Sequence, residues 1–330
     1  MKVLSFLNNK GGVGKTASVV NLAHILATVH EKRVLVIDLD PQGNCSNFFN
    51  KTDFVSLIRA HRMGIKEERL ASVGDLLIDS ELDIHKVVKD TDYERVKILP
   101  SYPTLSAIEE KLKADIKTPQ QFRLTNHLQK IQEEYDYCLI DCSPSLSILN
   151  INALVASDEV YIPTLVDDGS LFGIELTKTE LIDAVRKYSP KLKIGGIFFT
   201  RFKDHLNASK YSKELLGKFY EKLILPITIH ENTAVSDCTH NHAALLEFNK
   251  RCRAAKDYQM LAGYIVAPNR KIYLKKLQEQ MAAEKIAELE QKLKELETEV
   301  LDSSDTAATE AHEKKVAEYR RQIAQWKGEK

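Results

Sequence analysis

Short, continuous apolar runs alternate with amphipathic stretches of helical length over most of this chain, from about Lys2 to Val266. Continuous apolar runs are typical of strands that are buried on both faces of a parallel sheet. Strands and helices in alternation therefore predict a doubly wound, mostly parallel α/β sheet. The expected strands are 3–7, 34–38, 96–100, 137–141, 160–165 and 194–199, and the expected helices are 15–29, 104–112, 119–133, 170–188, 207–222 and 249–266.

The sequence changes character after residue 268. From Asn269 to Lys327 there is neither glycine nor proline, and apolar residues recur three and four positions apart. This heptad spacing predicts two helices around a turn at 302–309, which fold back as a hairpin or pair with another subunit; the alternative is one long solvated helix. We therefore expect a domain of residues 1–268 and a charged helical hairpin or coiled-coil tail of residues 269–330. The repeating positions are Ile286, Leu289, Leu293, Leu296, Val300, His312 (polar but in phase), Val316, Tyr319, Ile323 and Trp326.

The composition bounds the class of protein. Lys plus Arg and Asp plus Glu both number 47, so the net charge is zero and a histone-like polycation is excluded. Any contact with DNA must come from a local basic patch. The five scattered cysteines suit reduced thiols, and no apolar stretch reaches the roughly 18 residues of a membrane helix. The expected location is the cytoplasm.

A glycine-rich turn, KGGVGKT, follows the first expected strand and opens the first expected helix. Glycines allow successive N–H groups to converge on one anion, and the positive end of the helix adds to the attraction. This context predicts a phosphate-binding loop, or P-loop, in which Lys15 meets the β and γ phosphates and the Thr16 hydroxyl ligates Mg²⁺. The predicted cofactor-binding residues of the loop are Lys10, Gly11, Gly12, Val13, Gly14, Lys15, Thr16 and Ala17.

The loop departs from the standard GxxxxGK[ST] pattern at its start. Asn9 stands where the first glycine belongs, and Lys10 adds a second lysine. A lysine at this point does not easily reach its own γ-phosphate from the side that Lys15 occupies. It could instead reach across a dimer interface into a partner's site.

Aspartates end two of the expected strands. The segment VLVIDLDPQGN places Asp38 and Asp40 after one strand, and YDYCLIDCSPS places Asp141 at the end of another. Ligands gather at the carboxyl ends of the strands in parallel α/β sheets. We expect Asp141 and Asp38, together with Thr16, at the Mg²⁺ site. The predicted catalytic residues are Asp40, which orients the attacking water, and the two lysines, Lys10 and Lys15.

The chain resembles the ParA family of DNA-partitioning ATPases, the deviant Walker A group that includes MinD. The matching segments are KGGVGKT, DLDPQGN (38–44) and IDCSPSLSILNINALVASDEVYIP (140–163), and the resemblance covers residues 1–266. It implies ATP and Mg²⁺ as cofactors and an ATP-sandwich homodimer in which Lys10 contacts the partner's nucleotide. It also implies contacts to the adenine from Arg201 and Pro226. The tail has no counterpart in the family pattern.

The resemblance further implies nonspecific binding of double-stranded DNA and a ParB-like centromere-binding protein that stimulates hydrolysis, hence a nucleoid-associated protein that segregates or positions a cargo. Between Thr200 and Asp257 there are 10 basic and 7 acidic residues. Contacts to phosphates would give binding without sequence preference and with a steep salt dependence. The predicted DNA-binding residues are Lys203, Lys210, Lys250, Arg251, Arg253 and Lys256.

Two alternatives to the partition ATPase concern the tail. In the first, residues 312–327 form an amphipathic helix that holds a MinD-like ATPase on a membrane. Glu313 and Glu318 interrupt its basic face, so a membrane partner is disfavoured. In the second, the tail is a coiled-coil adaptor that nucleotide binding switches.

Overall fold

The structure, a computed structural model, describes most of the chain: residues 1–49, 63, 71–115, 119–204, 206–298 and 306–327. The chain divides into two compact units, Met1–Ala262 and Gly263–Lys330. The first unit contains all the motifs of the P-loop and the aspartates. The second contains the charged tail.

The first unit is built on one seven-stranded sheet among the described residues, in the order β3-β4-β2-β5-β1-β6-β7. All neighbouring strands are parallel except β3 and β4. The first strand lies inside the sheet, so the loop that follows it starts at the carboxyl edge with a strand on each side. The strands are β1 (Lys2–Phe6), β2 (Val34–Leu39), β3 (Lys89–Asp90), β4 (Val96–Leu99), β5 (Tyr137–Cys142), β6 (Glu159–Thr164) and β7 (Lys193–Phe199).

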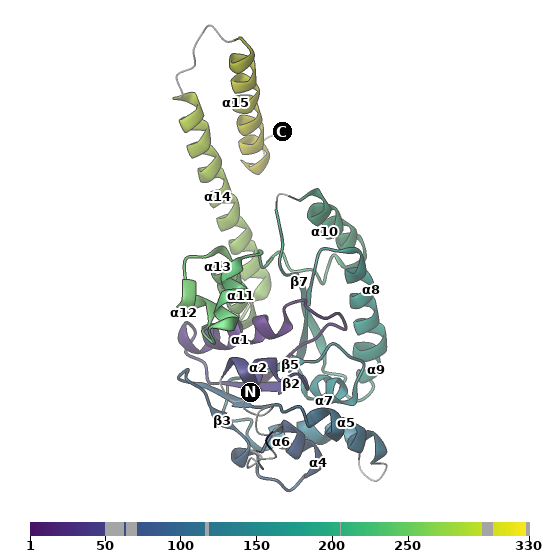
Figure 1. Ribbon diagram of the computed structural model, residues 1–330. Helices are drawn as coiled ribbons and strands as arrows, with labels where there is room; N and C mark the ends of the chain where they lie inside the picture. The colour runs from purple at the N-terminus through teal and green to yellow at the C-terminus, as the bar shows by residue number, and fades with distance from the viewer. Residues whose placement is uncertain (50–62, 64–70, 116–118, 205, 299–305, 328–330) are drawn as a thin grey trace. The chain divides into compact units, whose positions relative to one another are not determined.

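Helices cover both faces of this sheet (Figure 1). Helix α1 packs on β1, β2, β4 and β5 and also contacts α12, whereas α4, α6 and α7 pack together on the opposite face. The helices of this unit are α1 (Lys15–Thr28), α2 (Asn44–Phe48), α4 (Val73–Ile78), α5 (Leu105–Ala114), α6 (Arg123–Lys130), α7 (Ile148–Ala156), α8 (Asp168–Leu176), α9 (Asp183–Val185), α10 (Asn207–Tyr220), α11 (Thr233–His240), α12 (Leu245–Asn249) and α13 (Arg253–Val266), which crosses into the second unit.

The alternation of side chains along the strands decides where the aspartates point. On β2 and β5, residues such as Ile37 and Ile140 belong to the buried core that includes the side chains of α4 to α7. Asp38 and Asp141 are one position away from them, so they face the α1 side. The register pairs Asp38 with Asp141 on neighbouring strands, so the two carboxylates end side by side.

The predicted doubly wound fold is confirmed, with differences in detail. All six expected strands are present, and β3 is a short addition. The expected helix at 170–188 is α8, a π-helical stretch (Thr177–Ile182) and α9 in succession, and the expected helix at 119–133 is shortened to a 3₁₀ turn (Gln120–Phe122) and α6. Among the described residues, five α-helices were not predicted: α2, α4, α7, α11 and α12.

The second unit contains two long helices, α14 (Arg270–Glu297) and α15 (Thr306–Lys327), that pack against each other. Lys327 pairs with Glu290 at 2.9 Å and Arg320 pairs with Glu297 at 2.7 Å. From the first pair to the second, the position on α14 rises by seven residues and the position on α15 falls by seven, so the two pairs define one antiparallel register. Leu289 and Ile323 are buried. The tail therefore forms a hairpin within the chain.

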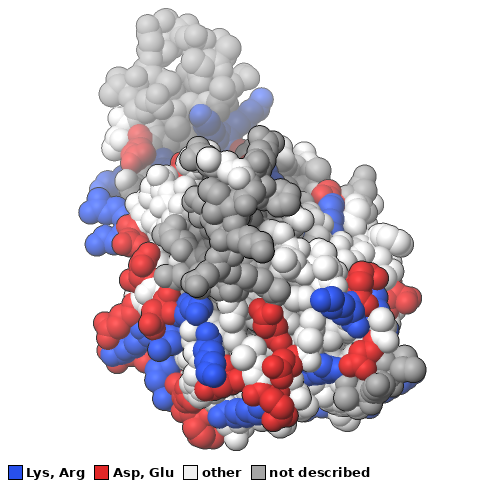
Figure 2. Space-filling model, turned by 60° about the horizontal axis from the view of Figure 1, so that its bottom comes forward, with Lys and Arg blue, Asp and Glu red and all other residues white. Residues whose placement is uncertain are grey.

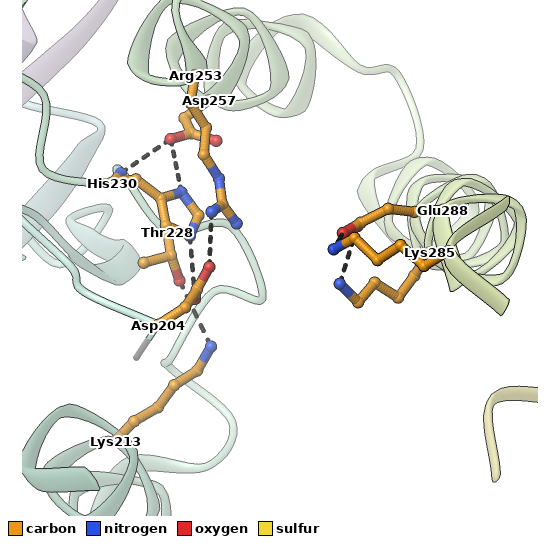
Figure 3. Close-up of polar contacts among 9 residues, drawn as sticks. Asp204, Lys213, Thr228, His230, Arg253, Asp257, Lys285 and Glu288 are labelled. Carbon is orange, nitrogen blue, oxygen red and sulfur yellow. Dashed lines mark hydrogen bonds and ion pairs between the residues drawn. The ribbon is translucent and has the colours of Figure 1, made fainter. Parts of the chain in front are cut away.

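Two of the predictions for the tail reach beyond the described residues. Val300 and residues 302–305 of the predicted turn lie outside them, whereas residues 306–309 are the first turn of α15. On α14, Glu288 accepts hydrogen bonds from Lys285 (Figure 3) and from Lys292, and these bonds lower the pKa of Glu288 to about 2 despite slight burial. Such i,i+3 and i,i+4 pairs support a long solvated helix.

The surface and the helices agree with the composition. On the face drawn in Figure 2, acidic and basic side chains are intermingled. Among the described residues, no helix combines the length and the apolar character needed to cross a membrane.

Candidate nucleotide-binding site

The glycine-rich loop between β1 and α1 presents a set of free backbone donors. Gly12 and Gly14 have positive φ angles of 71° and 82°, which only glycine adopts without strain. No N–H group from Gly11 to Ala17 donates a hydrogen bond to any described residue. Unpaired N–H groups at the positive end of a helix are a binding site for an anion such as phosphate. The loop therefore fits the phosphate-binding role predicted for it.

Lys15 places a positive charge inside this loop. Its Nζ donates to the backbone oxygens of Asn8 and Lys10, both at 3.1 Å, and the residue is 7% exposed. Burial lowers the pKa of Lys15, although the carboxylates of Asp141 and Asp40 act in the opposite direction. An incoming polyphosphate would therefore meet an ammonium group with little water to displace.

Thr16 and Asp141 form the clearest candidate for a metal site. The Thr16 hydroxyl donates to Oδ2 of Asp141 at 2.7 Å. The other oxygen, Oδ1, is buried and has no hydrogen-bond partner among the described residues. Burial, followed by the charge of Asp38, raises the pKa of Asp141 well above its ordinary value. An unpartnered, poorly solvated carboxylate oxygen beside a hydroxyl suits Mg²⁺, which prefers oxygen ligands.

The carboxylates of Asp38 and Asp40 accept different sets of hydrogen bonds. Asp38 is fully buried and accepts from the backbone N–H and the hydroxyl of Ser46, at 2.8 and 2.7 Å, and from the N–H of Asp40. Burial raises the pKa of Asp38 to about 6. These bonds fix the loop after β2, so direct ligation of a metal by Asp38 stays a prediction. The carboxylate of Asp40 accepts only from the N–H of Gln42 among the described residues, through Oδ1 at 2.9 Å, which leaves Oδ2 for another partner.

Lys10, the second lysine of the loop, contacts α8. Its ammonium group pairs with Asp167, the residue before that helix. Partial burial opposes ionisation of Asp167, but hydrogen bonds from Lys10 and Ser170 outweigh it and lower the pKa of Asp167. A Cβ at Gly169 would lie 3.2 Å from Nζ of Lys10, so this glycine allows the close approach.

A hollow of about 990 Å³ opens beside the loop, and its lining includes Gly14 and Ala17. Arg201, which was predicted near the adenine, lines it and is 63% exposed along its side chain. Pro226 is not among the described residues that line it; residues 229–233 line it instead. The hollow is the place in this unit where a base and ribose attached to loop-bound phosphates would fit.

Residues that support the loop were missed from the sequence. The Thr200 hydroxyl donates to the backbone oxygen of Val13 at 2.8 Å, and the Thr177 hydroxyl accepts from the N–H of Asn9 at 2.9 Å. The Asn8 side chain donates to the oxygen of Pro163 at 2.9 Å. The available signal was the position of Thr200, a polar residue directly after the apolar run of β7.

The six residues predicted to bind DNA fall on two neighbouring parts of the first unit. Lys250, Arg251, Arg253 and Lys256 lie before and within the start of α13, and all four are exposed. Arg253 pairs with Asp204 at 2.6 Å, which brings the loop after β7, with Lys203, beside α13. Lys210 is exposed on the first turn of α10.

Replacing Thr200 by Val tests the support of the loop. The change removes the bond to Val13 while keeping the shape, so we expect a loss of about 1 kcal/mol in the free energy of unfolding and about fivefold weaker ATP binding. Thr164→Val is the matched control, because the buried Thr164 hydroxyl has no hydrogen-bond partner among the described residues. Urea melts and calorimetric titration with ATP measure both quantities. Equal effects of the two substitutions would contradict a role for the Thr200 hydroxyl.

Comparison with known proteins adds an independent line of support. A family model described as an AAA domain, AAA_31, matches residues 1–194. The chain is 30% identical over 262 residues to the chromosome partitioning protein ParA of Myxococcus xanthus, covering 79% of this chain and 86% of that protein. It is 32% identical to the chromosome-partitioning ATPase Soj of Treponema pallidum, covering 81% and 97%.

Solved structures agree with the sequence relatives. A putative plasmid partition protein from Borrelia burgdorferi, solved with bound AMPPNP, is 26% identical with a TM-score of 0.62, over 80% of this chain and 98% of that one. Three observations indicate the same family: the fold, the loop with its two lysines, and relatives that match about four fifths of the chain. The chain belongs to the ParA/Soj family of P-loop partitioning ATPases.

Proposed function

We propose that this protein is an ATP-switched homodimer that binds DNA without sequence preference and segregates or positions a cargo. One observation supports the ATP-binding part: the N–H groups from Gly11 to Ala17 and the buried Oδ1 of Asp141 have no hydrogen-bond partner among the described residues. Together they are complementary to a polyphosphate chelated by a divalent cation. ATP with Mg²⁺ is the ligand that fits both.

The roles of the residues follow from their positions. The N–H groups from Gly11 to Ala17 and the ammonium of Lys15 bind the phosphates, and Thr16 with Asp141 holds Mg²⁺. Bound Mg²⁺ would neutralise the negative charge that develops on the transferred phosphoryl group. Asp40, whose Oδ2 accepts no bond from a described residue, orients the attacking water. Phosphoryl transfer needs little more than such positioning.

Lys10 links hydrolysis to dimerisation. In the single chain its charge is held by Asp167, at the rim of the loop. When two chains meet face to face over their nucleotides, Lys10 of each exchanges this partner for the phosphates bound by the other. A cation supplied across an interface accelerates phosphoryl transfer by roughly 10³ to 10⁵ in well-studied switches. Hydrolysis then removes the phosphate that holds the dimer together.

The exposed basic residues around the start of α13 contact the DNA. Lys250, Arg251 and Lys256 form no ion pair with another described residue, so their charges are available to phosphates. Such contacts give affinity without sequence readout. A dimer doubles the number of contacts, so ATP controls DNA binding. A ParB-like centromere-binding protein would stimulate hydrolysis and release the DNA.

The membrane alternative loses its main support in the second unit. It requires the apolar side of residues 312–327 to be free for lipid. Ile323 is only 8% exposed, and Arg320 and Lys327 pair with glutamates of α14. The hairpin thus covers Ile323 on the side that a membrane anchor would need, whereas Trp326 on the same side is 49% exposed. The role of the tail as an adaptor stays a prediction.

Two lysine substitutions separate binding from turnover. Lys15→Ala should weaken ATP binding on the order of 100-fold, because a charged hydrogen-bond donor to the phosphates is lost. Lys10→Ala should retain ATP binding but reduce hydrolysis on the order of 10³-fold. Calorimetry and a phosphate-release assay measure the two effects. Wild-type turnover of the Lys10 variant would refute its role across the interface.

Asp40→Ala should trap the ATP state. Without the group that orients water, the dimer forms with ATP but does not hydrolyse it. Light scattering after size exclusion should show a dimer that persists for hours with ATP and Mg²⁺ and disappears with EDTA. Asp237→Asn, an exposed change on α11, is the control and should behave as wild type. A variant that stays monomeric with ATP would count against this assignment.

Charge reversal tests the DNA surface. Lys250, Arg251 and Lys256, changed together to Glu, should weaken binding to every duplex sequence alike by more than about tenfold and flatten the salt dependence. The control reverses Lys314, Lys315 and Arg321, which are exposed on α15 and change the net charge equally. Fluorescence anisotropy with ATPγS from 50 to 300 mM salt measures both. Equal losses in both variants would show only a general charge effect.

A further inference from the structure

Two of the six residues proposed for DNA contact are already paired with carboxylates. Arg253 contacts Asp204 at 2.6 Å, and Lys203 contacts Glu231 at 2.6 Å. Glu231 also faces Arg201 at 3.5 Å. The basic patch at this place therefore contains its own counter-ions.

Asp204 is held in place from a second side (Figure 3). Its Oδ1 lies 3.3 Å from Nε2 of His230, while Oδ2 receives Arg253. The same imidazole contacts Asp257, a buried residue of α13, through Nδ1 at 2.8 Å. Although partial burial opposes it, the contacts with His230 and Arg253 lower the pKa of Asp204. Asp204 is thus an ionised group fixed against Arg253.

The geometry of the Arg253 pair permits exchange. The side chains of Arg253 and Asp204 are 59% and 52% exposed, so water and solutes reach the contact. Phosphate oxygens bind guanidinium donors in the same way as carboxylate oxygens do. A nucleic-acid phosphate and Asp204 would therefore compete for the same donors.

The counter-ions are connected to the nucleotide site. His230 and Glu231, which contact Asp204 and Lys203, both line the hollow beside Gly14 and Ala17. A base or ribose in this hollow would contact the segment that carries the pairs. A ligand in the hollow would therefore contact residues that are themselves in contact with Asp204 and Lys203.

We propose that Asp204 and Glu231 are internal counter-ions that occupy Arg253 and Lys203 in the nucleotide-free chain and compete with nucleic-acid phosphates for them. Nucleotide in the hollow rearranges residues 230–231 and frees the two cations. The inference rests on the proposed DNA binding and deepens it, because it names what prevents binding when nucleotide is absent.

Asp204→Asn is the main test, since Asp204 is not among the described residues that line the hollow. A labelled random-sequence duplex is titrated with protein by anisotropy, without nucleotide and with ATPγS and Mg²⁺. The variant should gain on the order of threefold to tenfold in affinity without nucleotide, and the gain from ATPγS should shrink. Asp204→Glu, which keeps the carboxylate, should behave as wild type. Asp237→Asn makes the same charge change on exposed α11 and should gain less than about twofold.

A double substitution tests whether the effect passes through Arg253. In a chain that already carries Arg253→Ala, Asp204→Asn should raise the duplex affinity without nucleotide by no more than Asp237→Asn does. Glu231→Gln should likewise gain affinity only when Lys203 is present. A gain that persists without Arg253, or a gain no larger than the control's, would overturn the proposal. Loss of affinity in Asp204→Asn would also overturn it, because Asp204 would then orient Arg253 for DNA.

The failures of the two proposals can be distinguished. If wild type binds the duplex with ATPγS and only the Asp204 result fails, the counter-ion inference falls and DNA binding stands. If wild type and all variants bind ATPγS but no duplex at 50 mM salt, both fall. Thermal melting of each variant, with and without ATPγS, shows that it is folded.

Discussion

The site depends on two carboxylates buried side by side at the carboxyl edge of the sheet. Asp38 and Asp141 are paired in register on neighbouring strands, and burial raises the pKa of both. Ser46 and backbone N–H groups compensate Asp38, whereas one oxygen of Asp141 has no described partner. Buried charge is costly unless it is paired or bound to metal. This imbalance explains why the Thr16 hydroxyl donates to Asp141 and why the charge of Lys15 opposes the rise in the pKa of Asp141. A metal–phosphate ligand would complete the site.

The cations proposed for partners outside the chain are paired within it. Lys10 contacts Asp167, and Arg253 contacts Asp204. Both contacts are partly exposed, so each can be exchanged for a phosphate at small cost. In the proposed mechanism, internal carboxylates occupy the place of a nucleotide phosphate beside Lys10 and of a DNA phosphate beside Arg253. Binding of either ligand would then replace an existing contact.

Local patterns predicted the strands and the phosphate loop because both are encoded by neighbouring residues. Helix α7 was missed because Asn150 and Asn152, both buried, break its apolar periodicity; their amides bond to backbone oxygens. The loop's supports, Thr177 and Thr200, are more than 160 residues distant in sequence, so no local pattern reveals them. The ion pairs of Lys203 and Arg253 with carboxylates could not be predicted from the sequence either, because they depend on how the loop after β7 packs against its neighbours.

The central claim is that Lys10 acts on the nucleotide of a second copy, and subunit mixing tests it most directly. A Lys10→Ala chain and an Asp40→Ala chain are each inactive alone. In a mixed dimer, the nucleotide bound to the Lys10→Ala chain lies beside the intact Asp40 of that chain and the intact Lys10 of the other chain. An equal mixture should then recover about a quarter of wild-type hydrolysis, since half of the dimers are mixed and each has one complete site. A mixture that forms mixed dimers yet remains inactive would contradict the account.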